Sequence, residues 1–178
     1  LNLKTVRTIA SLRENLRGWR GFNETVALVP TMGNLHAGHM SLVDVARTLA
    51  DRVVVSIFVN PTQFGPGEDF AAYPRTLDRD RRQLTRANVD LLFAPPVEEV
   101  YPDGFDTLVS VGAVARPLEG AARPGHFDGV ATVVAILFDL VGADRAYFGQ
   151  KDAQQVMVIR QMARDLAIPT EVVACPTV

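Results

Sequence analysis

The sequence predicts an α/β domain built on a Rossmann-like, open and mostly parallel sheet with helices on both faces. Stretches of strand length alternate with stretches of helical periodicity along the 178 residues, and this alternation is typical of βαβ units. The stretch 53–59 is continuously apolar and mostly β-branched, as expected of a strand buried on both faces. Apolar residues make up 48% of the chain, which is enough for a sizeable core.

The first half of the chain begins with apolar residues at helical spacing, namely Val6, Ile9, Leu12 and Leu16. Further along, an apolar face at helical spacing precedes the buried strand, and a strongly charged stretch follows it. The expected elements are a helix over 6–16, a strand over 25–29, a helix over 40–50, a strand over 53–59 and a helix over 75–87.

The second half continues the same alternation. Pro95 and Pro96 end the next strand, since proline cannot donate a hydrogen bond to a sheet. A short strand over 107–111 is expected at an edge of the sheet. The expected elements are strands over 89–94, 107–111, 145–148 and 171–175, and helices over 129–141 and 152–166.

Composition and charge narrow the class of protein. A net charge of -2 argues against a general nucleic-acid binder, which would usually be basic. The apolar stretch 130–141 is too short to span a bilayer and contains Asp139. A single cysteine, Cys175, excludes an internal disulfide, fits a reducing compartment and is expected to be a small buried side chain. We therefore expect a cytoplasmic protein that binds neither nucleic acid nor membrane.

The most informative motif is the run from Pro30 to His39, which lies between a predicted strand and a predicted helix. Ligands of open α/β sheets bind beyond the carboxyl ends of the strands. The start of a helix adds free N–H groups and a positive dipole end, which suit phosphate. Gly33 and Gly38 leave room for a nucleotide to approach the backbone. The candidate nucleotide-binding residues are Met32, Gly33, Asn34, Leu35, His36, Ala37, Gly38 and His39.

Three more polar groups follow predicted strands or precede predicted helices. They are the stretch 60–64, the stretch 149–152 with Gln154 and Gln155, and the stretch 123–127. Because the carboxyl ends of parallel strands meet at one edge of a sheet, we expect all of these residues to cluster with the histidine motif. Their amides would suit a small polar acid beside a nucleotide.

Each of these groups also has a structural explanation. The two histidines could cap a helix or pack in the core, and without a third ligand they do not predict a zinc site. Lys151 could be a solvated surface side chain, although a bound anion better explains a lysine beside Gly149 at a helix start. Gln63 could cap a turn, and Arg123 and His126 could be ordinary loop residues.

The motifs together resemble those of a known family. The stretch 32–39 resembles the His-x-Gly-His signature of the adenylate-forming nucleotidyltransferase superfamily. The stretches 54–64, 73–76 and 148–152, with Gln154 and Gln155, narrow the resemblance to the pantoate–β-alanine ligases, the bacterial pantothenate synthetases. The similarity covers nearly the whole chain, in order.

The resemblance implies an ATP-dependent ligase that joins D-pantoate to β-alanine through a pantoyl-adenylate intermediate. His36, His39 and Lys151 match the catalytic positions of the family. Gln63 and Gln155 match the pair that holds pantoate, and Asn60 and Arg123 are further candidates for binding pantoate or β-alanine, with Tyr73, Glu119 and His126 as second-rank candidates. The remaining implied ATP contacts are Gly149, Gln150, Lys151, Asp152 and Val178.

The resemblance also suggests how the metal arrives. Asp80 and Gln83 lie where some relatives are proposed to bind Mg²⁺, but Arg79 replaces an acidic neighbour. We therefore predict no metal site formed by the protein alone, and expect Mg²⁺ to arrive with ATP.

The family implied by the resemblance is homodimeric and has a second, smaller domain that closes a Ser-Ser-Arg motif over the triphosphate. The chain stops at Val178, where that segment should begin. We therefore expect 1–178 to be an N-terminal nucleotide- and pantoate-binding domain that is poor at adenylation by itself. Two alternatives stay open, namely a non-catalytic binding or dimerisation module, and a nucleotidyltransferase with another acceptor.

Overall fold

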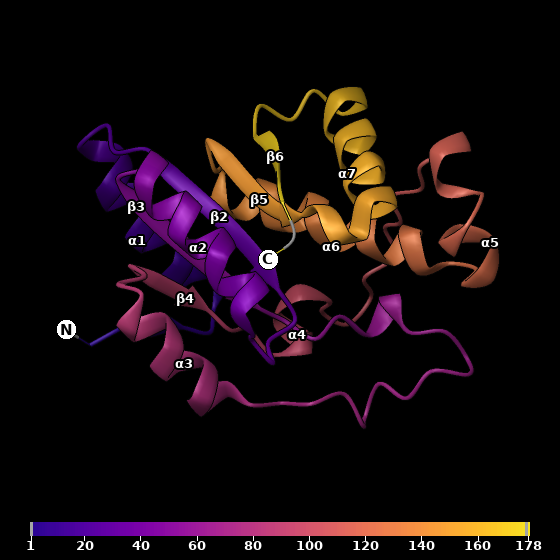
Figure 1. The fold of residues 1–178 in the computed structure, drawn as a ribbon, viewed down its shortest axis with the longest axis horizontal. Helices are drawn as coiled ribbons and strands as arrows, with labels where there is room; N and C mark the ends of the chain where they lie inside the picture. The colour runs from indigo at the N-terminus through magenta and orange to yellow at the C-terminus, as the bar shows by residue number, and fades with distance from the viewer. Residues whose placement is uncertain (1, 177) are drawn as a thin grey trace.

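A six-stranded sheet forms the middle layer of the molecule (Figure 1). The computed structural model describes residues 2–176 and 178. The strands lie in the order β1-β4-β3-β2-β5-β6, and every neighbouring pair among them is parallel. Their bounds are β1 Lys4–Val6, β2 Val26–Thr31, β3 Arg52–Ile57, β4 Leu91–Phe93, β5 Arg145–Gly149 and β6 Glu171–Cys175.

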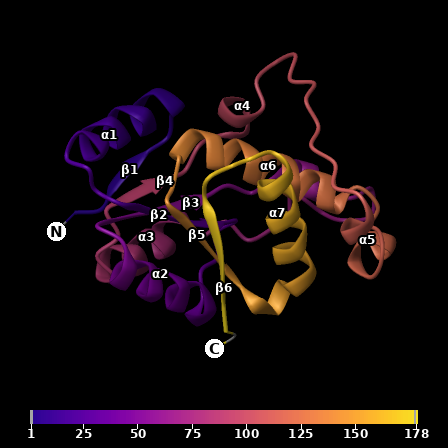
Figure 2. The ribbon, with the colours of Figure 1, turned by 90° about the horizontal axis from the view of Figure 1, so that it is seen from above.

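Helices cover both faces of this sheet, as the sequence predicts. Helices α1, α6 and α7 pack on one face, and α2 and α3 pack on the other (Figure 2). The longer helices are α1 Ile9–Gly21, α2 Ala37–Leu49, α3 Leu77–Arg86, α6 His126–Val141 and α7 Ala153–Asp165. The short ones are η1 Pro61–Gln63, α4 Val97–Val100, η2 Ala113–Ala115, α5 Glu119–Ala122 and η3 Gln150–Asp152. No helix of the described residues is long and apolar enough to cross a membrane.

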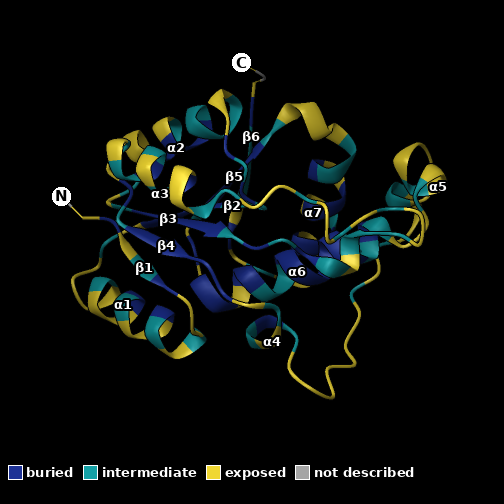
Figure 3. Ribbon diagram, turned by 90° about the horizontal axis from the view of Figure 1, so that it is seen from below, coloured by how far each residue is buried: buried dark blue, intermediate teal, exposed yellow. Residues whose placement is uncertain are grey.

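The central strands are buried on both sides, and alternate residues serve the two helical layers. On β2, Val26 and Leu28 pack toward α1 and α6, while Ala27 and Val29 pack toward α2 and α3. Figure 3 shows the buried strands between helices whose outer surfaces are exposed. The continuous apolar runs in the sequence therefore reflect a sheet without a solvent-facing side.

The topology contains one switch point, between β2 and β5. From β2 the chain passes through α2 to β3 on one side, whereas β5 pairs with the other side of β2 and is reached through α6. The helix that follows β2, α2, and the helix that precedes β5, α6, therefore lie on opposite faces of the sheet. Open α/β sheets bind their ligands in the crevice beyond the carboxyl ends of such strands.

Near the edges of the sheet, the structure corrects the start of one predicted helix and removes one predicted strand. Val6 belongs to the short strand β1 rather than to a helix, and the helix begins at Ile9 after Thr8, whose hydroxyl accepts a hydrogen bond from the Ser11 N–H at 3.2 Å. The stretch 107–111 forms no strand. Its Val109 N–H donates instead to the Thr132 hydroxyl at 2.9 Å, because this stretch runs along α6.

The other differences concern boundaries. Helix α6 begins at His126, three residues earlier than predicted, so that His126 and Phe127 belong to its first turn. The predicted strands 53–59 and 89–94 correspond to β3 Arg52–Ile57 and β4 Leu91–Phe93, although the N–H groups of Phe58 and Ala94 just beyond them still donate to neighbouring strands. Cys175 is buried, as expected.

Candidate active site

The loop between β2 and α2 makes a tight left-handed turn. Gly33 and Asn34 have φ angles of 79° and 52°, and α2 begins three residues later. His36 caps α2, and its Nδ1 accepts a hydrogen bond from the Gly38 N–H at 3.1 Å. The Nδ1 of His39 accepts from the His36 N–H at 3.3 Å, and the two ring centroids lie 4.1 Å apart. Both rings are thus fixed by the start of the helix.

These contacts determine what the two histidines can do. Because each Nδ1 accepts from a backbone N–H, the neutral ring carries its proton on Nε2, the nitrogen that can donate to a phosphate oxygen. Burial lowers the pKa of the His39 imidazole below its ordinary value, and the nearby His36 lowers it further. Asp80 and Asp152 oppose this pKa shift without reversing it. His39 is therefore suited to act as a neutral hydrogen-bond donor.

A cavity of about 280 Å³ opens beyond the carboxyl ends of β2 and β5, at the switch point. Its polar lining includes His39, Gln63, Tyr73, Asp152 and Gln155. Helix α6 contributes four apolar residues at positions i, i+3, i+4 and i+7, which form a single face of the helix. These residues are Val130, Val133, Val134 and Leu137.

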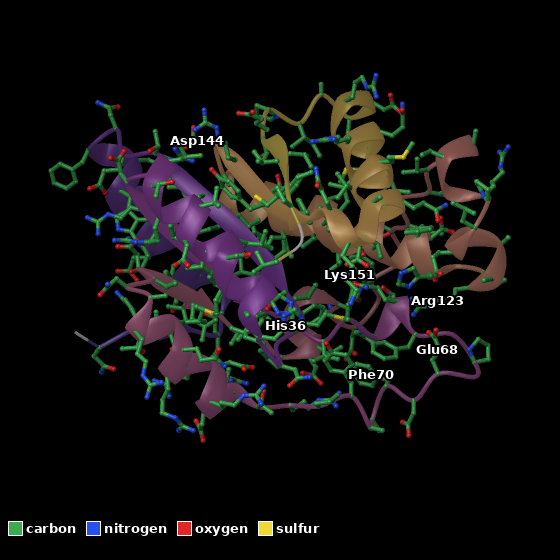
Figure 4. The ribbon with its side chains drawn as sticks, viewed as in Figure 1. His36, Glu68, Phe70, Arg123, Asp144 and Lys151 are labelled. Carbon is green, nitrogen blue, oxygen red and sulfur yellow. The ribbon has the colours of Figure 1, made fainter. Side chains whose placement is uncertain are left out.

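The structure brings only part of the predicted set to this cavity. Seven predicted residues line it, from four different segments of the chain: Met32, His39, Gln63, Tyr73, Gly149, Asp152 and Gln155. His36, Lys151 and Val178 are exposed and lie outside its lining. Figure 4 places His36 and Lys151 away from Asp144, which lies at the opposite end of the sheet. The cluster predicted at one sheet edge therefore forms, with the cationic Lys151 beside it rather than inside it.

Gln63 is held in place by Asn60, which is 1% exposed. The Asn60 amide donates to the Gln63 Oε1 at 2.9 Å and to the Gly129 carbonyl at 3.1 Å. Its oxygen accepts from the hydroxyls of Thr62 at 2.9 Å and of Tyr101 at 2.8 Å. Since both ends of its amide are engaged within the protein, Asn60 orients Gln63 and leaves the Gln63 NH₂ group to face a ligand.

Arg123 and His126 reach the same segment from the other side. The His126 Nδ1 lies 3.0 Å from the Gln63 carbonyl oxygen, and Arg123 lies 3.4 Å from the His126 Nε2. Arg123 also pairs with Glu68 at 2.6 Å (Figure 4). The Arg123 hydrogen bond, with a further one from the Gly65 N–H, lowers the pKa of Glu68 to about 2. Arg123 thus already has an anionic partner in the protein.

The acidic and amide residues considered for Mg²⁺ serve the histidine loop instead. Asp80 is fully buried, and its carboxylate accepts from the N–H groups of Asn34 and Leu35. The Gln83 amide donates to the Leu35 carbonyl at 3.3 Å, and Arg79 donates to the Asn34 Oδ1 at 2.7 Å. Within residues 2–176 and 178, no three His, Cys, Asp or Glu side chains gather as metal ligands would.

Sequence reasoning missed two features of the site. The resemblance marked Asp80 only as a possible Mg²⁺ position, and its hydrogen bonds to the histidine loop could not be predicted, since Asp78 and Asp80 are both acidic residues in the first turn of α3. The apolar wall from α6 could have been found, because its four residues repeat at helical spacing directly after Gly129.

The fold and the cavity define a Rossmann-like α/β domain with a ligand site at its switch point. The family model described as Pantoate-beta-alanine ligase matches residues 4–178, and the chain belongs to this family. The chain is 54% identical over 178 residues to a pantothenate synthetase of Paracoccus denitrificans, and covers 63% of that protein. It is 59% identical over 177 residues to a pantothenate synthetase of Thermus thermophilus, and covers 62% of it.

Solved structures give the same result. The chain matches the pantothenate synthetase of Thermus thermophilus with a TM-score of 0.94 at 58% identity, over 99% of this chain and 62% of that one. It also matches a pantoate-beta-alanine ligase of Francisella tularensis, described as a complex with beta-gamma ATP and beta-alanine. That match has a TM-score of 0.94 and 40% identity, over 99% of this chain and 67% of that one. The chain spans less than two thirds of the length of the curated relatives named above.

Proposed function

We propose that the protein containing this domain is a ligase that condenses D-pantoate with β-alanine at the expense of ATP. The observation that carries the proposal is the cavity at the switch point, which His39, Gln63 and Gln155 line together. Family membership and the ATP and β-alanine named for the Francisella structure support the same reaction. For the 178 residues themselves, we propose binding of ATP and D-pantoate.

In the first step of this proposal, the pantoate carboxylate attacks the α-phosphorus of ATP and pyrophosphate leaves. Charge builds on the phosphates, so fixed donors matter more than covalent catalysis. The Nε2–H groups of His36 and His39 would donate to phosphate oxygens, and Lys151 would balance their charge. Mg²⁺ would arrive on the phosphates of ATP. Together with His36, His39 and Lys151, the proposed ATP contacts are Met32, Gly33, Asn34, Leu35, Ala37, Gly38, Gly149, Gln150, Asp152 and Val178.

The cavity suits pantoate in both size and polarity. The amides of Gln63 and Gln155 would bind its carboxylate and hydroxyls, while its dimethyl carbon would pack on the apolar face of α6. The β-alanine amine would then attack the acyl carbon of the adenylate, releasing AMP, which is a better leaving group than oxide. Asn60 and Arg123 would act on this site by holding the Gln63 segment.

We further propose that 1–178 forms the nucleotide- and pantoate-binding domain of a longer, cytoplasmic, homodimeric protein. The share of the relatives that the chain covers supports the greater length of the whole protein. Adenylation by the 178 residues alone should then be slow, because closure of a second domain both excludes water and completes such sites.

The deciding experiment measures pyrophosphate release from ATP with and without D-pantoate, before β-alanine is added. We expect slow, pantoate-dependent release, reduced by about 10²–10³-fold in a His39→Ala variant that has lost a transition-state donor. Product analysis identifies the class of reaction, because a ligase forms an acyl adenylate whereas a nucleotidyltransferase leaves the nucleotide on its acceptor. A folded chain that binds neither ATP nor pantoate would contradict the proposal and favour a dimerisation module.

A further inference from the structure

We propose that Asp80 is a positioning residue that holds the β2–α2 loop in the conformation that presents the two histidines. Asp80 lies on α3, on a different element from the loop, and is 0% exposed. One carboxylate oxygen accepts from the Asn34 N–H at 2.9 Å, and the other accepts from the Leu35 N–H at 3.0 Å. The proposal deepens the proposed function, since this loop is the one assigned to ATP.

The loop needs such support because its conformation is unfavourable by itself. Asn34 has a φ of 52°, in the left-handed region that residues with a side chain adopt only uncommonly, asparagine more readily than most. The turn directs two successive N–H groups toward one point, an arrangement that binds anions. The Asp80 carboxylate occupies that point and satisfies both donors. A Cβ on Gly33 would lie 3.2 Å from the same carboxylate, so the loop and Asp80 approach closely.

Packing provides only part of this support, through Leu35, which is 4% exposed and belongs to the core beneath α2 and α3. Behind the loop lies a second cavity, of about 260 Å³, lined by Gly33 and Asp80. Met32 borders both this cavity and the one at the switch point. The loop is therefore backed partly by the core and partly by open space, and the hydrogen bonds from α3 add to the packing of Leu35.

The surroundings of Asp80 are arranged for this role rather than for a metal. The Thr76 hydroxyl donates to the carboxylate at 3.0 Å, and the Arg79 guanidinium lies 3.7 Å from it. A cation would have to compete for this fully buried carboxylate with three donors, the N–H groups of Asn34 and Leu35 and the Thr76 hydroxyl. If Asp80 were a metal ligand, its substitution would lower ATP affinity only when Mg²⁺ is present. If Asp80 is a positioning residue, the loss of ATP affinity should be the same with Mg²⁺ and with EDTA.

The test compares Asp80→Asn with Asp78→Asn. The control removes an equal charge from the same helical turn, but Asp78 is exposed and has no contact with the loop among the described hydrogen bonds. Amide hydrogen exchange at Asn34 and Leu35 reports on the loop directly. Calorimetric titration gives affinities for ATP, with Mg²⁺ and with EDTA, and for D-pantoate.

For Asp80→Asn we expect faster exchange at both amides and ATP affinity lower by about tenfold, with Mg²⁺ and with EDTA alike, because the asparagine NH₂ group cannot accept from a backbone N–H. Affinity for D-pantoate should stay within about twofold. A general loss of structure would lower both affinities together. A fall in ATP affinity with little change in D-pantoate affinity therefore identifies Asp80 as a positioning residue of the loop. Asp78→Asn should change none of these quantities.

Three results would overturn the inference: unchanged exchange at Asn34 and Leu35, a loss of ATP affinity confined to Mg²⁺, or an equal loss for both ligands. If the wild-type chain binds no ATP, the proposed function fails, whereas the exchange measurement still decides the role of Asp80. Should Asp80→Asn not fold, Thr76→Val provides a milder version, since it removes only one donor to the carboxylate. It should accelerate exchange at the same two amides.

Discussion

The close approach of the two histidine rings depends on one missing side chain. A Cβ on Gly38 would lie 2.9 Å from the Cε1 and 3.1 Å from the Nδ1 of His36, closer than packed atoms allow. We expect Gly38→Ala to displace the His36 ring and break its hydrogen bond to the residue 38 N–H, although alanine favours helices. ATP affinity, measured by calorimetric titration, should fall by about tenfold.

Gly18→Ala is the matched control for this change. Gly18 lies inside α1, a different helix from the one that contains Gly38, and nothing comes within 4 Å of a Cβ placed there. It should raise the free energy of unfolding by about 0.5–1 kcal/mol and leave ATP affinity unchanged. Equal ATP affinities for the Gly38→Ala and wild-type chains would show that the position of the His36 ring does not matter for binding.

At the scale of elements, the site depends on how closely α6 approaches η1. A Cβ on Gly129 would lie 2.6 Å from the Thr62 carbonyl carbon and 2.9 Å from the Gln63 backbone nitrogen. Gly129→Ala must therefore push η1 away from α6, with an overpacking cost of about 1–3 kcal/mol in the free energy of unfolding. Because Gln63 moves with η1, D-pantoate affinity should fall while ATP affinity changes less.

Denaturant unfolding and titrations with both ligands check this expectation, with Gly18→Ala again as the control. Unchanged D-pantoate affinity in a destabilised Gly129→Ala chain would show that the contact between η1 and α6 stabilises the fold but does not contribute to binding. That result would remove Gln63 from the proposed site.

The elements themselves were largely predictable, because long segments carry a clear period. The strands β2, β3, β5 and β6 and the longer helices show either continuous apolar runs or helical spacing. The strand β1 was missed because three residues show no period, and Val6 also fits the helical spacing of α1. The stretch 107–111 looks like an edge strand, but Thr132 supplies the partner for its Val109 N–H.

The site was predictable only where a motif lies at a strand end. His39, Gln63 and Gln155 follow from the rule that strand ends converge, and they do line one cavity. Asn60 lies in the predicted stretch 60–64, but its role and that of Asp80 do not follow from this rule, because both act through long-range hydrogen bonds to the backbone. Local sequence cannot reveal a partner that is 45 or 69 residues away.

At the scale of the whole molecule, five ion pairs among the described residues lie at the end of the sheet opposite the cavity, whereas Arg123–Glu68 and Arg79–Asp80 lie near the cavity. The ion pairs near the amino ends of the strands tie helix ends, strand starts and neighbouring strands together, whereas the cavity lies at the carboxyl ends. Each exposed pair contributes at most about 1 kcal/mol, so their effect is collective. These pairs are Arg20–Asp144, Arg47–Asp90, Arg52–Glu24, Arg52–Asp90 and Arg145–Glu171.

Asp144 tests whether stability and binding are separate in this way. Its carboxylate accepts from the Val26 N–H at 2.8 Å and from Arg20 at 2.8 Å. Burial by itself would raise the pKa of Asp144, but the hydrogen bonds from Val26 and Arg20 outweigh it and lower the pKa below its ordinary value of 3.8. The folded chain then binds this proton less readily than the unfolded chain does. The contribution to stability is therefore complete above the ordinary pKa and is lost as the pH falls through the lowered one.

Asp144→Asn should accordingly lower the free energy of unfolding at neutral pH by less than about 1 kcal/mol, because solvent screens this half-exposed carboxylate, and flatten the decline of stability on acidification below the ordinary pKa. Denaturant unfolding across that pH range measures both effects, and Asp139→Asn, an exposed carboxylate on α6, controls for the loss of charge. ATP and pantoate affinities should stay unchanged, because the cavity lies at the other end of the sheet. A fall in either affinity would show that the two ends are coupled through β2 and β5, the paired strands that run from Val26 and Asp144 toward the site.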